Sequence, residues 1–333
     1  MAIQVFYDKD ADPTVLQTRK VAVLGYGSQG QAHAQNLRDA GSDVLVAQRP
    51  GSTNHALAVE HGFRPIPIDE ASRLADLLVF ALPDETMGDI YNQHVAPHLS
   101  RGQALGFIHG FSIRFGQIVP PPDVDVIMIA PKGPGTLVRE RFIQGGGLTC
   151  FFAVHQNATG QARNLALAWG SAIGGGKGGM IETTFTEECE ADLFGEQTVL
   201  CGGVIELAKA AFETLVDAGY SPETAYFECV HEIKQVVDML YADGFSAMRR
   251  KISNTAAYGG LTRGPRLISD QAKSEMRAIL DEIRSGRFAK EWLAECRNGG
   301  PDLVHRSEVE ANHPCQLAGQ TVRDLSRQAL PPK

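Results

Sequence analysis

Long apolar segments are missing from this sequence of 333 residues. No stretch reaches the roughly 18 consecutive apolar residues that a membrane-spanning helix needs. The first ten residues, MAIQVFYDKD, also lack the basic start and the apolar run of a secretory signal. We therefore expect a cytoplasmic protein that has no membrane partner.

Paired cysteines and an excess of positive charge are missing as well. The six cysteines show no C-x-x-C spacing, so neither a zinc knuckle nor a disulfide framework is indicated, and we expect buried thiols in a reducing compartment. The formal net charge of −8 argues against nucleic acid as a partner. What remains is an ordinary globular protein whose length fits two domains.

Short apolar runs alternate with helical patterns in the first half of the chain, which predicts an α/β domain with a parallel sheet covered by helices. The glycine-rich segment GGGKGGMIETT, residues 174–184, breaks this alternation, and no convincing strand follows it. We therefore predict an α/β domain over residues 1–183 and an all-α domain over residues 184–329. The predicted strands begin at residues 21, 43, 77, 104, 124 and 150.

Helix signals support the assignment of the second half. Thr184 with Glu187 fits a capping box, which predicts a helix that runs from there toward Asp217. Ser221 before Pro222 predicts the start of the next helix. Further helical patterns occupy residues 270–284 and 288–296.

A G-x-G-x-x-G motif stands between the first predicted strand and a predicted helix, in VAVLGYGSQGQAHAQNLRDAG. Gly25 permits a tight turn, Gly27 lets the backbone approach a pyrophosphate, and Gly30 lets the helix pack on the strand. The amides at the start of the helix would then face the anion. A glycine-rich turn without a ligand is the alternative, but the order of strand, motif and helix favours a Rossmann dinucleotide-binding domain.

An acidic residue is missing at the end of the second predicted strand, where NAD-binding folds usually hold the ribose 2′-hydroxyl with Asp or Glu. Gln48 stands there instead, followed by Arg49 and Ser52. A guanidinium and a hydroxyl can hold a 2′-phosphate through charge-assisted hydrogen bonds, so we expect NADPH. A loop of ordinary turn residues is the alternative.

Two pairs of carboxylates occur in the predicted helical domain. Asp192 and Glu196 are four residues apart in ADLFGEQTVLCGG, and Glu228 and Glu232 are four apart in YFECVHEIKQVVDML. Residues at i and i+4 share a helix face, where like charges repel by roughly a few tenths of a kcal/mol unless a cation lies between them. Two solvated helix faces would also explain the pattern.

The sequence resembles the ketol-acid reductoisomerases, specifically the short form with one helical domain after the Rossmann domain. The resemblance implies that the all-α domain is knotted. It implies an enzyme of valine and isoleucine biosynthesis, in which 2-acetolactate or 2-aceto-2-hydroxybutanoate undergoes an alkyl migration and NADPH reduces the product to a 2,3-dihydroxy-3-methyl acid. The matching segments, in family order over essentially the whole chain, are FYDKDAD, GYGSQGQAHAQNLRDAG, LPDE, HGFSI, DVDVIMIAPKGPG, IETTFTEECEADLFGEQTVLCGG, AGYSPETAYFECVHEIK and ISNTAAYGG.

This resemblance assigns a function to the two acidic pairs, which would hold two Mg²⁺ ions over the substrate. Four carboxylates become tolerable when two hard cations with oxygen ligands lie between the helices. Glu232 would in addition relay a proton. Three neighbouring acids, Glu187, Glu188 and Glu190, have no metal role in the family, and we expect them in a solvated first helical turn. The implied ligands are Asp192, Glu196, Glu228 and Glu232.

The resemblance also implies catalytic roles for His109 and Lys132, for which a satisfied core histidine and a surface lysine are the alternatives. Ser253 matches a serine that binds the substrate carboxylate, with Ile252 and Ala256 beside the alkyl group, and a helix-capping serine is the alternative. The implied cofactor-binding residues are Gly25, Tyr26, Gly27, Ser28, Gln29, Gly30, Arg49, Ser52, Asn54, Asp84, Glu85, Thr86, Met87 and Gly135.

A helical domain with several apolar faces would expose large apolar patches as a monomer, so we expect at least a dimer through this domain, with acids from two chains in each site. Other functions remain open. Departures from the family pattern at Gln31 and Thr136, where His is common, fit a specialised paralogue that acts on a related acetohydroxy acid in secondary metabolism. A 3-hydroxyacid-type dehydrogenase would need no acidic quartet, and a non-catalytic dinucleotide-binding protein would turn over no substrate.

Overall fold

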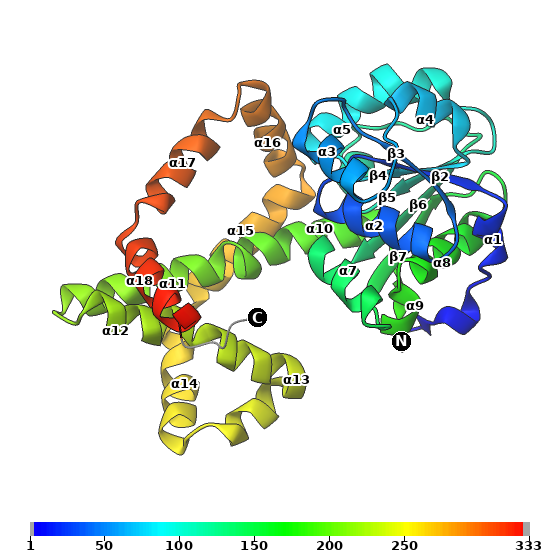
Figure 1. The fold of residues 1–333 in the computed structure, drawn as a ribbon. Helices are drawn as coiled ribbons and strands as arrows, with labels where there is room; N and C mark the ends of the chain where they lie inside the picture. The colour runs from blue at the N-terminus through cyan, green and yellow to red at the C-terminus, as the bar shows by residue number, and fades with distance from the viewer. Residues whose placement is uncertain (1–2, 329–333) are drawn as a thin grey trace. The chain divides into compact units, whose positions relative to one another are not determined.

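Eight strands form one sheet in the computed structural model, which describes residues 3–328 and divides into two units between Ala191 and Asp192 (Figure 1). All six predicted strands are present. Two further strands, β1 and β8, are too short for a sequence pattern to predict them. The strands are β1 Val5–Phe6, β2 Lys20–Leu24, β3 Asp43–Ala47, β4 Leu77–Phe80, β5 Ala104–Phe107, β6 Asp125–Pro131, β7 Cys150–Gln156 and β8 Met180–Glu182.

The sheet is mostly parallel, in the order β1-β8-β7-β6-β5-β4-β2-β3. Strands β3, β2, β4, β5 and β6 run parallel, whereas β7 runs antiparallel to β6, and β1 runs antiparallel to β8. The predicted parallel sheet is therefore confirmed for these five strands, and the edge formed by β7, β8 and β1 adds antiparallel pairs. A strand buried on both faces is apolar in either direction, so its sequence does not specify its orientation.

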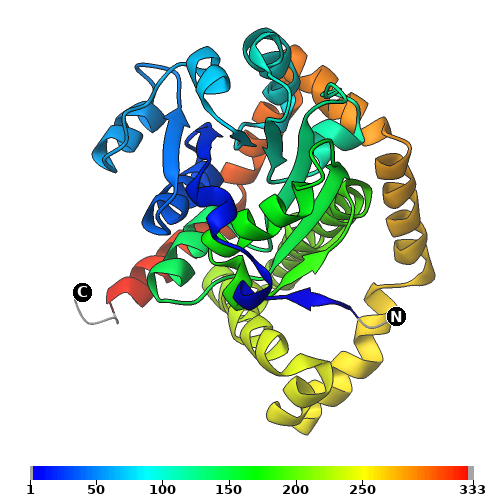
Figure 2. The same ribbon diagram turned by 90° about the vertical axis from the view of Figure 1, so that its right-hand side faces the viewer.

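Helices cover both faces of the sheet (Figures 1 and 2). Successive residues of a strand point to opposite faces. Val21 and Val23 of β2 therefore pack with α2 and α8, while Ala22 and Leu24 pack with α4 and α5. The helical elements of this unit are η1 Asp8–Asp10, α1 Thr14–Gln17, α2 Ser28–Asp39, α3 Thr53–Glu60, α4 Ile68–Leu74, α5 Asp84–Ile90, η2 Tyr91–Val95, η3 Ala96–His98, α6 Phe111–Arg114, α7 Gly135–Ile143, α8 Ala162–Ala172 and α9 Gly175–Gly178.

The described part of the second unit is entirely helical, as predicted, and the predicted domain end at residue 329 lies outside the described residues. Ser221 caps α12 with Pro222 in its first turn, as expected. No helix in the described part of the chain has both the length and the apolar character that crossing a membrane requires. The helical elements are α10 Phe185–Gly195, which spans the division, η4 Glu196–Leu200, α11 Gly203–Asp217, α12 Pro222–Tyr226, η5 Phe227–His231, α13 Ile233–Lys251, α14 Asn254–Leu267, α15 Asp270–Arg284, α16 Arg287–Arg297, α17 Pro301–Ala311 and α18 Pro314–Gln328.

The predicted helix from Thr184 to Asp217 is interrupted. Its first part ends in the π-helical turn η4, and α11 begins only at Gly203. Two consecutive glycines at this point weaken helix propagation by about 1 kcal/mol each. Cys201 in the break is exposed, so the expectation of buried thiols is wrong for this residue.

Apolar side chains are less completely covered in the second unit than in the first. Helices α11, α12 and α18 pack around a small core that includes Phe212 and Val322 (Figure 1). In contrast, Tyr241, Phe245 and Tyr258 are 90%, 72% and 67% exposed. Exposed apolar surface of this kind is typical of a face that a partner covers.

Candidate functional site

A cavity of about 950 Å³ lies at the carboxyl ends of β2, β3, β4 and β5, and we call it the sheet-end cavity. This edge is where open α/β sheets bind their ligands. The volume is within the usual range for a ligand pocket, about 300–1,000 Å³. The cavity is lined by Gly25, Tyr26, Gly27, Ser28, Gln29, Ala47, Gln48, Arg49, Pro50, Asn54, Pro67, Ile68, Asp69, Phe80, Ala81, Leu82, Pro83, Asp84, Thr86, Met87, Ile90, His94, Ile108 and His109.

The glycine turn between β2 and α2 leaves room for an anion. Gly25 has a φ of +95°, and a Cβ there would lie 2.5 Å from the carbonyl oxygen of Ala81. A Cβ on Gly27 would meet no atom within 4 Å, so bare backbone faces open space at this position. No side chain of residues 3–328 caps the start of α2, so its first amides are available to a pyrophosphate.

The loop after β3 is held by its own side chains. Gln48 accepts a hydrogen bond from the backbone nitrogen of Tyr26 at 3.0 Å and donates one to Ser52 Oγ at 3.0 Å. Ser52 Oγ also accepts from the nitrogen of His55 and donates to the carbonyl of Arg49. The Ser52 hydroxyl is therefore occupied with capping α3, and Ser52 does not line the cavity, whereas Arg49 does.

Most of the predicted cofactor residues line this one cavity. Gly30, Ser52, Glu85 and Gly135 do not. A Cβ on Gly135 would lie 2.2 Å from the carbonyl oxygen of Ser28, so the missing side chain allows α7 to pack on α2. The binding roles of the individual residues remain predictions.

Glu188 joins His109, which follows β5, to Lys132, which follows β6. Its Oε2 is 3.1 Å from His109 Nδ1, and its Oε1 accepts a hydrogen bond from Lys132 Nζ at 2.8 Å. Oε2 also accepts from the backbone nitrogen of Gly110 at 3.1 Å. The Glu188 side chain is only 1% exposed, so these bonds replace its lost hydration.

The pKa values of this assembly move in opposite directions. Burial lowers the pKa of His109, but its hydrogen bonds with Cys189 and Glu188 and the Glu188 charge outweigh burial and raise the pKa well above its ordinary value. Burial raises the pKa of Glu188, but the His109 hydrogen bond and the neighbouring cations prevail and lower it. Both shifts favour the charged forms of the two groups.

The expectation that Glu188 lies in a solvated helical turn is wrong. Phe185, Glu188 and Cys189 share the face of α10 that packs against the end of the sheet, and all three are buried. The i, i+3, i+4 spacing of this face was visible in the sequence and could have identified Glu188. Glu190 pairs with Arg114 at 2.7 Å, and Glu187 is exposed as expected.

The four predicted metal ligands occupy two helical segments with π-helical turns. Asp192 follows Glu188 by one turn of α10. Glu196 begins η4, Glu228 lies within η5, and Glu232 follows it. Carboxylate oxygens are the ligands that Mg²⁺ prefers, so the donor chemistry fits this ion.

Ser253 caps a helix. Its Oγ accepts a hydrogen bond from the backbone nitrogen of Ala256 at 3.1 Å at the start of α14. Ile252 is the C-terminal cap residue of α13. The capping alternative is therefore confirmed, and contact of these three residues with a substrate remains a prediction.

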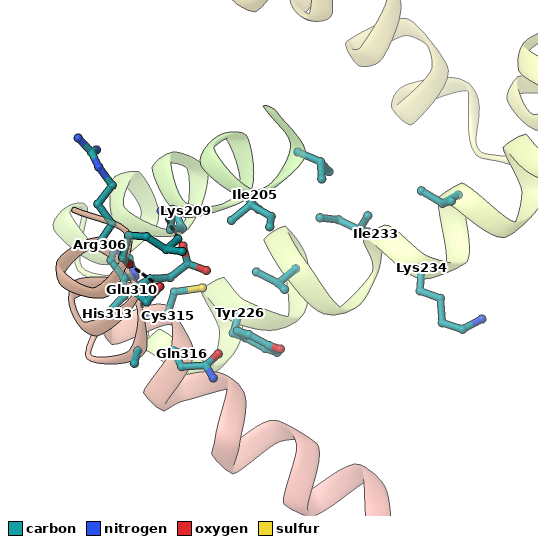
Figure 3. A pocket seen from close by; sticks show the side chains of 17 residues that line it. Ile205, Lys209, Tyr226, Ile233, Lys234, Arg306, Glu310, His313, Cys315 and Gln316 are labelled. Atoms are coloured by element: carbon teal, nitrogen blue, oxygen red, sulfur yellow. Dashed lines mark hydrogen bonds and ion pairs between the residues drawn. The ribbon is translucent and has the colours of Figure 1, made fainter. Parts of the chain in front are cut away.

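A second cavity, of about 800 Å³, lies within the helical unit (Figure 3). Lys209, Arg306 and Glu310 gather at one end, and Ile205 and Ile233 contribute apolar surface. The cavity contains none of the predicted catalytic, metal-binding or substrate residues. It is lined by Val204, Ile205, Ala208, Lys209, Tyr226, Val230, Ile233, Lys234, Val237, Leu303, Arg306, Ser307, Glu310, Ala311, His313, Cys315 and Gln316.

Two family models match the chain, one to each half. Residues 15–179 match "Acetohydroxy acid isomeroreductase, NADPH-binding domain", and residues 185–328 match "Ketol-acid reductoisomerase, C-terminal domain". The structure of an NADH-preferring ketol-acid reductoisomerase from an uncultured archean is 43% identical, covers 97% of this chain and 99% of that chain, and superposes with a TM-score of 0.94.

More distant structures share the fold alone. A semialdehyde dehydrogenase NAD-binding protein from Cupriavidus necator is 20% identical, with a TM-score of 0.63, over 80% of this chain and 99% of that chain. Pyrroline carboxylate reductase from Plasmodium falciparum is 16% identical, with a TM-score of 0.50, over 81% of this chain and 98% of that chain. The two family models and the match at 43% identity show that this chain belongs to the ketol-acid reductoisomerase family.

Proposed function

We propose that this chain converts 2-acetolactate or 2-aceto-2-hydroxybutanoate to the corresponding 2,3-dihydroxy-3-methyl acid, in valine and isoleucine biosynthesis. An alkyl group first migrates to the neighbouring carbon, and the new ketone is then reduced. The observation that supports this function most is the His109–Glu188–Lys132 assembly, whose His109 lines the sheet-end cavity in a member of this family.

Asp192, Glu196, Glu228 and Glu232 would hold two Mg²⁺ ions, since all four offer carboxylate oxygens. When bound, the ions supply positive charge for the oxygens of the substrate, and the reduced nicotinamide supplies the hydride. Ser253 would contact the substrate carboxylate, with Ile252 and Ala256 beside the alkyl group.

The buried carboxylate of Glu188 holds two basic side chains, those of Lys132 and His109. It holds the Lys132 ammonium in one place, where its charge can stabilise an oxygen that becomes negative. It also favours the protonated form of His109, whose imidazolium can donate a hydrogen bond toward the nicotinamide end of the cavity. Glu232 would relay the proton that the migration step moves between the two oxygens of the substrate.

NADPH is the proposed coenzyme, and the proposed preference over NADH is small. Arg49 lines the cavity with no acid beside it at the end of β3, and this arrangement favours a 2′-phosphate. The occupied hydroxyl of Ser52 and the carboxylate of Asp69, in the same cavity, reduce that preference. The similar archaeal enzyme prefers NADH.

A dimer through the helical domain would complete the site. The exposed apolar side chains of the second unit, among them Tyr241 and Phe245, favour a partner that covers them. A second copy would cover this apolar surface and would contribute its own Glu228 and Glu232 to the site.

Oxidation of NADPH in the presence of 2-acetolactate tests the function. We expect turnover with Mg²⁺ and none after its removal by a chelator. A 3-hydroxyacid-type dehydrogenase would instead turn over its own hydroxy acid without metal, and a non-catalytic binding protein would bind NADPH without oxidising it.

A further inference from the structure

An aspartate and two histidines form a cluster beside the sheet-end cavity. The Asp69 carboxylate lies 3.2 Å from Nδ1 of His94, on the π-helical turn η2, and 3.2 Å from Nε2 of His98, on η3. Arg73 lies 3.0 Å from the same nitrogen of His98. Asp69 and His94 line the cavity, whereas His98 does not.

The contact with Asp69 determines which nitrogen of His94 carries the proton. A carboxylate accepts hydrogen bonds, so it fixes the hydrogen on Nδ1 and leaves the lone pair on Nε2 of the neutral imidazole. His94 Nε2 has no hydrogen-bond partner among residues 3–328, and the side chain is 44% exposed. His94, a residue of the cavity wall, therefore offers an oriented acceptor that no described protein group uses.

The position of this acceptor along the cavity indicates which part of a dinucleotide it would meet. The glycine turn after β2 receives the pyrophosphate, and His109 marks the nicotinamide end beyond β5. Asp69 lies in the opposite direction, because Ile66 pairs with Ala47 at the end of β3 and Pro67 leads from there into α4. The end of β3 is the adenosine side of a Rossmann domain.

We infer that His94 recognises the adenine base, with Nε2 accepting a hydrogen bond from the exocyclic amine and Asp69 positioning the ring. Adenine offers an N–H donor at this edge, whereas hypoxanthine has a carbonyl oxygen there. Two acceptors would then face one another, so the cavity should discriminate between the two bases. The inference depends on the proposed function only for the presence of the dinucleotide in this cavity.

Equilibrium binding tests the inference without turnover. The fluorescence of the reduced nicotinamide reports the titration of NADPH and of its hypoxanthine counterpart equally, since the two differ only in the base. We expect the native chain to bind NADPH about two- to tenfold more tightly, the effect of one neutral hydrogen bond. His94→Phe keeps a ring and removes the acceptor. It should bring the ratio of the two affinities, NADPH over its hypoxanthine counterpart, close to one.

His98→Phe is the matched control, because it removes the other histidine on Asp69 and leaves the cavity wall unchanged. It should keep the native ratio, and His94→Gln, whose amide oxygen can accept a bond, should keep part of it. Asp69→Asn should lower the ratio, since an amide no longer fixes the proton of His94. Circular dichroism verifies that each variant is folded.

A native ratio in His94→Phe would overturn the inference while leaving the proposed coenzyme intact. Failure of the native chain to bind either dinucleotide would overturn both the proposed coenzyme and the inference. If His98→Phe lost the preference for NADPH as His94→Phe does, the preference would depend on the cluster as a whole. This result would also contradict a direct contact between His94 and adenine.

Discussion

The ammonium of Lys132 donates a hydrogen bond of 2.8 Å to Glu188, whose side chain is almost completely buried. Lys132 follows a strand and Glu188 lies on α10, 56 residues away along the chain. The pair thereby connects the end of the sheet to the helix that leads to the acidic residues. Its integrity is thus expected to matter both for folding and for catalysis.

Glu188→Gln removes the charge that His109 and Lys132 share and keeps the size of the side chain. We expect the free energy of unfolding to fall by about 2 kcal/mol, below the usual cost of breaking a buried ion pair because the Lys132 side chain is 30% exposed. Urea denaturation measures this change. The exposed Glu187→Gln should alter stability by less than about 0.5 kcal/mol, and equal effects of both variants would refute a special role for Glu188.

Because His33 is buried, we expect the free energy of unfolding to decrease in acid. Burial lowers its pKa from 6.5 to about 3, so the folded chain holds it neutral while the unfolded chain takes up a proton. The contribution of His33 to the free energy of unfolding is therefore complete above pH 6.5. It decreases as the pH falls toward 3, by up to about 1.4 kcal/mol per pH unit.

His33→Gln tests this pH dependence, because Gln keeps an acceptor for the indole N–H of Trp169 and does not titrate. Denaturation at a series of pH values should give a flatter acid slope for this variant, whereas the exposed His305→Gln should retain the native slope. An unchanged slope in His33→Gln would contradict a neutral buried imidazole.

Removing one carboxylate from either acidic pair should abolish most of the activity. Asp192→Asn and Glu228→Gln each take one charged oxygen ligand from Mg²⁺, and we expect kcat/KM to fall at least about 100-fold, since even indirect partners of a metal contribute 10–100-fold. Glu223→Gln, on the neighbouring α12, is the exposed control and should remain active. Full activity of Asp192→Asn or Glu228→Gln would exclude the proposed site.

Mixing two inactive variants tests whether each site uses two chains. In a dimer of Asp192→Asn with Glu228→Gln, one site receives both altered residues and the other receives neither. Random exchange of equal amounts should therefore restore about one quarter of the native activity. If the subunits exchange and no activity returns at any ratio, the shared site is wrong.

The coenzyme preference should be modest. With Arg49 as the main phosphate ligand, we expect kcat/KM for NADPH to exceed that for NADH by about tenfold, equivalent to roughly 1.4 kcal/mol from one charged hydrogen bond. The double variant Ser52→Asp, Asn54→Asp should reverse the preference by repelling the phosphate. A native ratio of one or less would show that this loop does not recognise the phosphate.

Local patterns predicted much of the fold. Alternation of strand and helix signals located six strands, and the pattern at residues 270–284 coincides with α15. The direction of β7 was not predictable, because a fully buried strand is apolar in either orientation. The interruption after Glu196 was missed because a π-helical turn differs from an α-helix in hydrogen bonding and not in hydrophobic pattern.

The candidate site was predictable where backbone geometry requires a particular residue. It was less predictable where the role of a residue depends on whether its side chain is buried. Gly25 and Gly27 follow directly from the turn, and both line the cavity. Glu188 was misassigned, because a buried carboxylate is stable only with partners such as Lys132, which lies far away in the sequence. His94 was overlooked for the same reason, since its partner Asp69 is 25 residues away.

The structure of the product tests the central claim most directly. Methyl migration followed by reduction converts 2-acetolactate to 2,3-dihydroxy-3-methylbutanoate, whereas direct reduction of the acetyl group would give 2,3-dihydroxy-2-methylbutanoate. Proton NMR distinguishes the two, because only the second contains a methyl doublet coupled to the carbinol proton. With NADPH and Mg²⁺ we predict the 3-methyl product, with two methyl singlets and an uncoupled carbinol proton. Formation of the 2-methyl product, or of the same product after chelation of Mg²⁺, would contradict a metal-dependent isomeroreductase.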